Sequence, residues 1–312
     1  MDVLESLPQQ LVYGLALGSV YAMIALGYSM VYGVLEFINF SHGEVFMVGA
    51  FASLLTLTAL TGIGGVVSWG PVLLLLMLLA AMVASGALGV AVERLAYRPL
   101  RRSSRLAPLI SAIGVSLILQ NIVMLLQVRF QGDSRPQFVA AGEVVPAGGW
   151  DVLGVRISHT AGLVFGVSIV LMLALGALVT RSSLGRSMRA TAQDPEVAGL
   201  MGINVSGVIT RTFLIGSGLA GAAGCLVALY YTQIDYTMGF SAGIKAFAAA
   251  VLGGIGSIRG AMAGGLVLGV TEAFAATFMS AAYKDLIAFA LLVLVLAIRP
   301  AGLLGRKTLE RV

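Results

Sequence analysis

The polar residues of this sequence best placed to do chemistry lie together in the stretch FINFSHGEVFMVGAF, residues 37–51. Apolar residues flank the stretch on both sides. Ser41 and Glu44 have the S-x-x-E spacing of a capping box, in which both side chains satisfy free backbone N–H groups at the start of a helix. Polar residues at membrane spans also mark transport pathways. The two interpretations are compatible. The pathway candidates are Asn39, Ser41, His42, Gly43 and Glu44.

A second set of candidates lies in the glycine-rich segment GGIGSIRG, residues 253–260. The segment is close to a dinucleotide-binding fingerprint, but Arg259 stands where the third glycine belongs. We therefore interpret the glycines as points where helix backbones approach closely. They serve packing alone, or they mark a broken helix that lines a transport pathway. The candidates for such a break are Gly253, Gly254 and Gly256.

A short polar helix is predicted within residues 181–205. Asp194 is a suitable N-cap, Pro195 suits the first helical position, Glu196 complements the helix dipole and Gly202 can end the helix. The helix is too short to cross a membrane, so it either lies at the interface or docks into a groove on a partner. Its residues of interest are Asp194, Pro195, Glu196, Val197, Ala198, Gly199, Leu200 and Gly202, with Val197, Leu200 and Met201 forming an apolar face.

Motifs for catalysis and for metal binding are missing from the sequence. Neither the phosphate-binding G-x-x-x-x-G-K-[ST] loop nor H-E-x-x-H occurs. The chain has two histidines, His42 and His159, and a single cysteine, Cys225, within an apolar run. We therefore expect no catalytic residue, no metal site and no cofactor in this chain.

The elements that must position these candidates are membrane helices. Of the 312 residues, 59% are hydrophobic and 11% are charged, and the mean hydropathy is +0.99. A spanning helix needs about 20 apolar residues, and the apolar runs are 11–32, 45–92, 106–128, 157–180 and 212–234. The second run is long enough for two helices joined near 61–71, and shorter pieces follow residue 246. We predict an all-α polytopic membrane protein with eight or nine transmembrane helices, some broken or re-entrant, forming one domain over residues 1–312.

The distribution of arginine and lysine predicts the orientation of this bundle, because cytoplasmic loops are enriched in positive charge. Three basic clusters are Arg94, Arg98, Arg101, Arg102 and Arg105; Arg181, Arg186 and Arg189; and Arg299, Arg306, Lys307 and Arg311. Facing all three clusters toward the cytoplasm places the N-terminus outside and the C-terminus inside. The acidic start of the chain favours an uncleaved anchor over a signal peptide. These clusters also account for the pI of about 9.6, so nucleic-acid binding is not expected.

Four segments resemble the permease subunits of branched-chain amino acid ABC importers, specifically the LivH type. They are INFSHGEVFMVGAF (38–51), RPLRRSSRLAPLISAIGVSLILQN (98–121), AVLGGIGSIRGAMAGG (250–265) and YKDLIAFALLVLVLAIRPAGLLGR (283–306). The resemblance runs nearly end to end, with Arg259 departing from a position where proline is common.

This resemblance implies a function and a set of partners. The chain would be a permease subunit that translocates leucine, isoleucine and valine into the cytoplasm by alternating access, in the inner membrane of a bacterium. Asp194 to Gly202 would be the coupling helix, seated in a cleft of an ATP-hydrolysing subunit. Two such ATPases with bound Mg-ATP, a second homologous permease and an external or periplasmic solute-binding protein would complete the transporter.

Other functions remain open at this stage. A permease of the same family could carry urea, short amides or other amino acids. A stand-alone ion-coupled transporter could use Glu36, Glu44, Asp235 or Glu272 as a relay, although these carboxylates could equally be caps or interface contacts. The glycine content also allows a passive channel. Dependence of flux on ATP or on an ion gradient separates these functions.

Overall fold

The computed structural model describes residues 3–62, 69–101, 103–104, 106–152, 154–279 and 283–305. Among these residues, seven helices are long and apolar enough to span a membrane. They are α1 (Val3–Leu35), α2 (His42–Gly62), α3 (Gly70–Val92), α4 (Leu106–Gln131), α5 (His159–Arg181), α8 (Val205–Tyr231) and α10 (Ile258–Phe278). Two shorter helices complete the last third, α9 (Met238–Gly253) and α11 (Lys284–Ile298). The prediction of an all-α membrane bundle is confirmed, and these short helices explain why spans there were hard to count from apolar runs.

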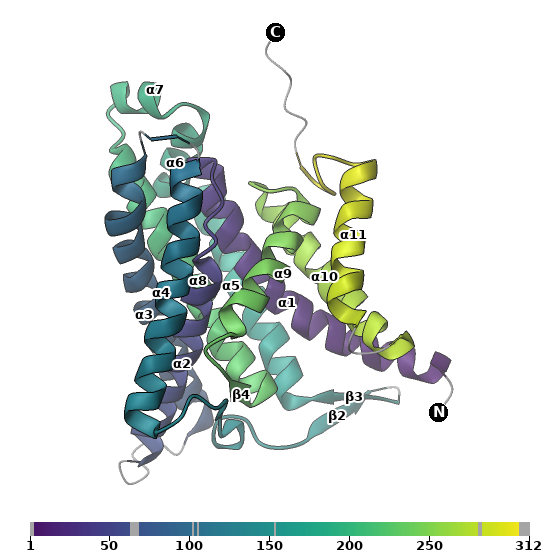
Figure 1. Cartoon of the computed structure of the whole chain (residues 1–312). Helices are drawn as coiled ribbons and strands as arrows, with labels where there is room; N and C mark the ends of the chain where they lie inside the picture. The colour runs from purple at the N-terminus through teal and green to yellow at the C-terminus, as the bar shows by residue number, and fades with distance from the viewer. Residues whose placement is uncertain are drawn as a thin grey trace.

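Short elements lie at both ends of the bundle. At one end are the π-helix η1 (Glu93–Tyr97), the 3-10 helix η2 (Arg98–Leu100), and the helices α6 (Ser183–Gln193) and α7 (Pro195–Leu200). At the other end are η3 (Ala141–Glu143) and four strands, β1 (Gln137–Phe138), β2 (Gly149–Val152), β3 (Val155–Ser158) and β4 (Gln233–Ile234). The strands form two antiparallel pairs, β1 with β4 and β2 with β3. The long helices run between these two ends (Figure 1).

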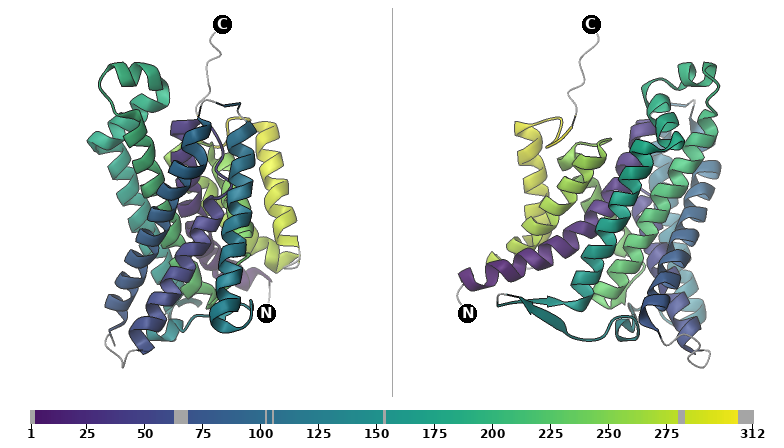
Figure 2. Two further views of the ribbon diagram at one scale, coloured as in Figure 1. Left: turned by 60° about the vertical axis from the view of Figure 1, so that its left-hand side comes forward. Right: turned by 180° about the vertical axis from the view of Figure 1, so that it is seen from behind.

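The termini of the bundle lie at opposite ends. In both views of Figure 2, α1 begins near the β2–β3 end, whereas α11 ends toward the α7 end. The described basic residues of the three predicted clusters lie in, or directly after, elements at the α7 end: Arg94, Arg98, Arg101, Arg181, Arg186, Arg189 and Arg299. Arg102, Arg105, Arg306, Lys307 and Arg311 fall outside the described residues. The described members of the three clusters therefore share one end of the bundle, as the positive-inside rule requires of a single orientation.

Helix α8 is the centre of the bundle, with 89% of its apolar span buried inside the protein. It packs against α2, α3 and α1. A side chain in place of Gly221 would collide with the Ala81 carbonyl and the Ser85 side chain of α3, so only glycine permits this approach. Glycine also permits a close contact between α1 and α10, where Gly269 lies against the backbone of Gly18. Small residues let membrane helices pack backbone to backbone, and the sequence supplies them at these contacts.

Helix α2 begins inside the bundle and not at its rim. The His42 ring fills the space beside Gly27, where a side chain would collide with it. Gly27 lies eight residues before the end of α1 at Leu35, a distance of about 12 Å at 1.5 Å per residue. Between the two helices, residues 36–41 are irregular, and Asn39 and Ser41 are 3% and 0% exposed. Irregular backbone at membrane depth is tolerated only where protein or water provides its hydrogen bonds. The polar side chains of this segment are therefore expected to form such hydrogen bonds.

Candidate functional site

The polar cluster at residues 39–44 divides into two parts with different partners. In the first part, the Ser41 hydroxyl donates to Asn39 Oδ1 over 2.6 Å, and the Tyr97 hydroxyl of η1 donates to the same oxygen over 2.5 Å. The Ser41 backbone N–H also donates to Asn39 Oδ1, over 3.1 Å. Asn39 therefore joins the segment between α1 and α2 to the end of α3.

The predicted capping box between Ser41 and Glu44 is wrong. The Glu44 backbone N–H donates to the Ser41 carbonyl and not to its hydroxyl. The Glu44 carboxylate does not fold back on its own helix, because Oε1 accepts a hydrogen bond of 3.1 Å from Ser116 on α4. The residues match the motif, but the Ser41 hydroxyl bonds to Asn39 and contacts Tyr97, while Glu44 accepts from Ser116 of α4.

The second part of the cluster, His42 with Glu44, retains unused polar atoms. Among the described residues, neither ring nitrogen of His42 nor Glu44 Oε2 has a hydrogen-bond partner, and both residues are 1% exposed. The His42 ring lies edge-on to Tyr28, with centroids 4.8 Å apart. Glu44 faces Gly239 in the first turn of α9, where a side chain would meet its carboxylate. Buried polar atoms without partners are rare in folded proteins, so these two residues remain candidates for a transport pathway.

A cavity of about 250 Å³ lies close to Glu44, between α4 and the start of α9. Its lining includes Tyr28, Ser116 and Gln120 on one side, with Phe240 and Ile244 of α9 on the other. Ser116 is the residue that donates to Glu44, so this small cavity adjoins the polar start of α2.

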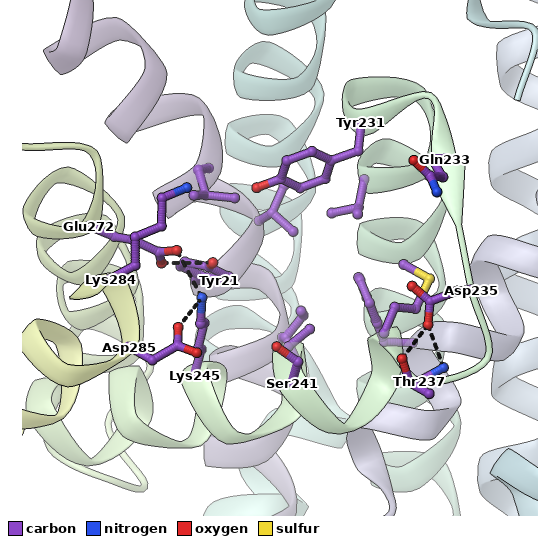
Figure 3. Close-up of a pocket in the computed structure, with 17 residues that line it drawn as sticks. Tyr21, Tyr231, Gln233, Asp235, Thr237, Ser241, Lys245, Glu272, Lys284 and Asp285 are labelled. Carbon is purple, nitrogen blue, oxygen red and sulfur yellow. Dashed lines mark hydrogen bonds and ion pairs between the residues drawn. The ribbon is translucent and has the colours of Figure 1, made fainter. Parts of the chain in front are cut away.

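A larger cavity, of about 640 Å³, lies on the opposite side of α9 between α1, α10 and the first turn of α11 (Figure 3). Its charged wall joins three helices through Lys245. The Lys245 ammonium lies 2.8 Å from Glu272 Oε1 and 2.8 Å from Asp285 Oδ1. The Tyr21 hydroxyl donates to Glu272 Oε2 over 2.9 Å. We call this space the charged cavity.

The first turns of α9 separate the two cavities. Phe240, Gly243 and Ile244 line the small cavity, whereas Ser241 and Lys245 line the charged cavity. The alternation follows the helical repeat, in which residues three or four apart share a face. One short helix therefore forms a wall common to both spaces.

From the sequence, Glu272 and Asp235 are candidates for an ion relay, for caps or for interface contacts, whereas nothing there assigns Tyr21, Lys245 and Asp285 to a site. A signal was present, because Lys245 is an isolated charge before an apolar segment, and such residues face the interior of a bundle or a cavity. The ion pair between Lys245 and Glu272 could not be predicted from the sequence, because the two residues are 27 positions apart in the chain.

The predicted glycine break lies away from both cavities. Gly253, Gly254 and Gly256 form the turn between α9 and α10, and Gly254 and Gly256 have φ of +105° and +83°. Gly253 packs against the backbone of Gly260, while Gly254 packs against Gly305. These glycines do not line the two cavities described above. Their contacts favour the packing interpretation, and a role in the pathway stays an untested prediction.

The predicted polar helix forms as expected. Asp194 is the N-cap of α7, and its side chain accepts from the N–H groups of Glu196 and Val197 over 2.9 and 3.0 Å. The chain leaves the helix at Gly202 with φ of +83°. Ala198 is buried, whereas Val197, Leu200 and Met201 are 53%, 86% and 78% exposed. The helix therefore presents its apolar side chains outward at the end of the bundle.

A buried ion pair lies at the same end of the bundle as α7. Glu93 of η1 is fully buried and pairs with Arg101, whose Nη1 also donates to Ser206 of α8 over 3.3 Å. The second oxygen of Glu93 accepts from Thr210 of α8 over 3.0 Å. The end of α3 is thus tied to the first turns of α8, which begin a few residues after α7.

The described residues contain no group of three or more His, Cys, Asp or Glu side chains that could hold a metal ion. Cys225 is buried and is not in a disulfide.

Comparison with known proteins gives one consistent result. The family described as branched-chain amino acid transport system / permease component matches residues 10–296. The high-affinity branched-chain amino acid transport system permease protein BraD of Pseudomonas aeruginosa is 48% identical over 310 residues, with 97% of each chain covered. LivH of Salmonella typhimurium, which carries the same description, is 45% identical over 304 residues, again with 97% of each chain covered. The match includes α7 and the residues that line both cavities.

Proposed function

Because the chain belongs to the family of branched-chain amino acid transport permease components, we propose that it is a membrane subunit of an ATP-driven importer of leucine, isoleucine and valine. The resemblance found in the sequence is thereby confirmed at the level of the family. Two relatives with 45% and 48% identity are named as permeases of branched-chain amino acids, which supports this substrate class over urea or short amides. The chain works as a transport subunit and performs no covalent chemistry of its own.

The partners of the proposed importer are a second homologous permease, two ATPase subunits that bind Mg-ATP, and an external solute-binding protein. The α7 end, which carries the described basic clusters, faces the cytoplasm of the bacterial cell. The start of α1 lies outside and the C-terminus lies inside. The hairpin end, with β2 and β3, then faces the solute-binding protein.

The observation that carries the proposal is the exposed apolar face of α7. Val197, Leu200 and Met201 are exposed, and α7 lies at the end of the bundle beyond the membrane helices (Figure 1). Three such residues are too few to anchor a helix in lipid. A helix that presents apolar anchors three and four residues apart fits a groove on a partner protein. An ATPase subunit is the partner that the family implies.

The route from α7 into the bundle is short. The Ile203 N–H donates to the Ala198 carbonyl over 3.0 Å, and the Asn204 side chain caps α8 by accepting from Gly207 N over 2.9 Å. A displacement of α7 therefore moves the start of α8, the central helix. The Glu93 ion pair extends that displacement to α3 through Arg101 and Thr210.

Alternating access follows if the ATPases favour one arrangement of these helices over another. A ligand shifts a conformational equilibrium only through its different affinity for the two states. ATP binding on the partner subunits supplies that difference, and hydrolysis removes it. Within this chain, the cavities on the two sides of α9 supply separate spaces whose access such a movement can exchange.

The test is ATP-dependent import by the complete transporter in proteoliposomes. Leu200→Glu places a charge on the exposed apolar face of α7, where Leu200 is 86% exposed, so we expect the fold to be retained while docking is blocked. Gln193→Glu is the matched control, because it adds the same charge to an exposed residue at the end of α6, outside the apolar face of α7. We expect Leu200→Glu to lose the ATPase subunits and import, and Gln193→Glu to keep both. Retention of ATPases and import in Leu200→Glu contradicts docking at α7.

An ion-coupled transporter is the second candidate, and the buried Lys245–Glu272 pair is the observation that favours it. Charged residues within membrane helices often form proton or cation relays. Import driven by a proton or sodium gradient in vesicles without ATP would support this function. Import that needs ATP and ignores both gradients rejects it.

A further inference from the structure

We infer that the charged cavity binds the ammonium and carboxylate groups of a free amino acid, through exchange of the ion pair between Lys245 and Asp285. The inference rests on the proposed function, because it names the part of the permease that receives the substrate. It concerns a zwitterion that carries an apolar side chain and no net charge.

The charges on the wall of the cavity match such a ligand. Lys245 and Lys284 supply two positive charges, and Glu272 and Asp285 supply two negative charges beside them. Asp235 adds a third negative charge on the other side of the cavity, where the Thr237 N–H donates to it. An anion would satisfy the lysines and repel the carboxylates, and a cation would do the reverse. A ligand with one charge of each sign can pair with both a lysine and a carboxylate. Repulsion of ligands that carry a single charge then gives the cavity specificity.

The two carboxylates that hold Lys245 differ in a way that permits exchange. Glu272 is 3% exposed, and both its oxygens are occupied, one by Lys245 and one by Tyr21. Glu272 therefore fixes the ammonium in place. The Asp285 side chain is 63% exposed, and an ion pair with an exposed partner contributes little free energy. A ligand carboxylate can replace Asp285 on Lys245 while the ligand ammonium binds Asp285.

The remaining wall suits a branched aliphatic side chain. Leu17, Val20 and Ile24 of α1 and Val227 of α8 also line the cavity. A volume of about 640 Å³ lies within the range of roughly 300–1,000 Å³ that is usual for small-molecule pockets. Figure 3 shows Lys245, Glu272, Lys284 and Asp285 on one side of the cavity, with Ser241 between them and Asp235 on the other side. The cavity therefore offers charged and apolar contacts to the same ligand.

The experiment measures protection of a cysteine in the cavity. Ser241 is exposed and lines the charged cavity, so Ser241→Cys is made in a Cys225→Ala background. The complete transporter, without its solute-binding protein, is reconstituted in proteoliposomes and labelled with a methanethiosulfonate reagent. Gln233→Cys, also exposed at the cavity, is the second labelling position.

Leucine, isoleucine and valine are expected to slow labelling. A free ligand concentration ten times the dissociation constant leaves about one site in eleven open, which is a decrease of roughly tenfold in rate. Leucinamide, which lacks the carboxylate, and 4-methylpentanoate, which lacks the ammonium, are expected not to protect. Asp285→Asn and Lys284→Gln should abolish protection by leucine, whereas Asp133→Asn, at an exposed position away from the cavity, should leave it intact.

Three results overturn the inference. The first is an unchanged labelling rate in saturating leucine at both positions, and the second is equal protection by leucine and its two analogues. The third is unchanged protection by leucine in Asp285→Asn together with a lower unfolding temperature, because the charge cluster is then only structural. Import of leucine by the unlabelled wild-type transporter is measured separately. If that import proceeds while protection fails, the cavity inference is wrong and the proposed function stands.

Discussion

The Tyr97 hydroxyl at the end of α3 donates a hydrogen bond of 2.5 Å to Asn39 Oδ1, in the irregular segment between α1 and α2. Both residues are buried. The bond holds the segment against a helix that follows it by 58 positions in the chain.

Tyr97→Phe removes this donor and leaves the Ser41 bonds to Asn39 in place. We expect a loss of about 1 kcal/mol of stability, the net value of a typical hydrogen bond. Asn39→Ala should cost more, because it removes the oxygen that accepts three hydrogen bonds, from the Ser41 N–H, the Ser41 hydroxyl and the Tyr97 hydroxyl. Thermal unfolding of the purified complex measures both variants. Equal stability of Asn39→Ala and Tyr97→Phe would contradict the central position of the Asn39 oxygen.

The Glu93–Arg101 pair should be important for stability. Arg101→Met leaves the fully buried Glu93 carboxylate without its cation, and breaking a buried pair in this way costs about 3–5 kcal/mol. Arg98→Met is the matched control, because Arg98 is exposed on the neighbouring 3-10 helix. We expect a large fall in unfolding temperature for Arg101→Met alone. Similar unfolding temperatures for the two variants would show that the ion pair contributes little.

The N-cap of α7 makes a separate prediction about assembly. Asp194→Ala removes the acceptor of two backbone N–H groups, and such a change costs roughly 1 kcal/mol of helix stability. Asp194→Asn keeps an N-cap of similar quality. In co-purification, the alanine variant should retain fewer ATPase subunits than the asparagine variant. The reverse order would indicate that the charge of Asp194, and not its capping, matters for docking.

The contact between α1 and α10 depends on glycine. A side chain at Gly269 would collide with the backbone of Gly18, so Gly269→Leu must separate the two helices. Overpacking costs about 1–3 kcal/mol or more, and we expect little folded protein in the membrane. Gly176→Leu on α5 is the control, since nothing lies within 4 Å of the added carbon. Equal yields of folded protein from the two variants would contradict this packing.

Glu44 tests the pathway role of the polar start of α2. Glu44→Gln preserves the size of the side chain and an oxygen that can accept from Ser116. If the carboxylate shapes the pathway, the import rate falls while the amount of assembled transporter stays constant. Ser116→Ala is a useful comparison, because it removes only the donor. Unchanged import and substrate preference in Glu44→Gln would remove Glu44 from the pathway candidates.

Predictions from the sequence are accurate where an interaction acts between neighbouring residues, and they fail where the partners lie far apart in the chain. The start of α7 was predicted to the residue, because the Asp194 side chain acts on neighbouring backbone, and the helix ends at Leu200, two residues before Gly202. The apolar runs also located six of the seven long helices, whereas α10 lies among the shorter pieces that follow residue 246. The capping box failed because Ser116, 72 positions from Glu44, and Tyr97, 56 positions from Ser41, engage the two side chains instead.

The charged cavity could be predicted only in part. Lys245, Glu272 and Asp285 each stand out as charges within or beside apolar segments. Their pairing depends on the relative rotation of α9, α10 and α11, which small residues set by permitting close backbone contact. Nothing in the local pattern of one helix encodes that rotation. The separation of two cavities by α9 is likewise a property of the assembled bundle.

The irregular segment at residues 36–41, in which Asn39 and Ser41 are buried, also bears on how the protein is made. A ribosome delivers α1 and this segment to the membrane before Tyr97 and the helices that cover it. Non-helical backbone has no hydrogen-bond partners in lipid. The start of α2 is therefore expected to reach its final depth only once Tyr97 and the later helices have entered the membrane.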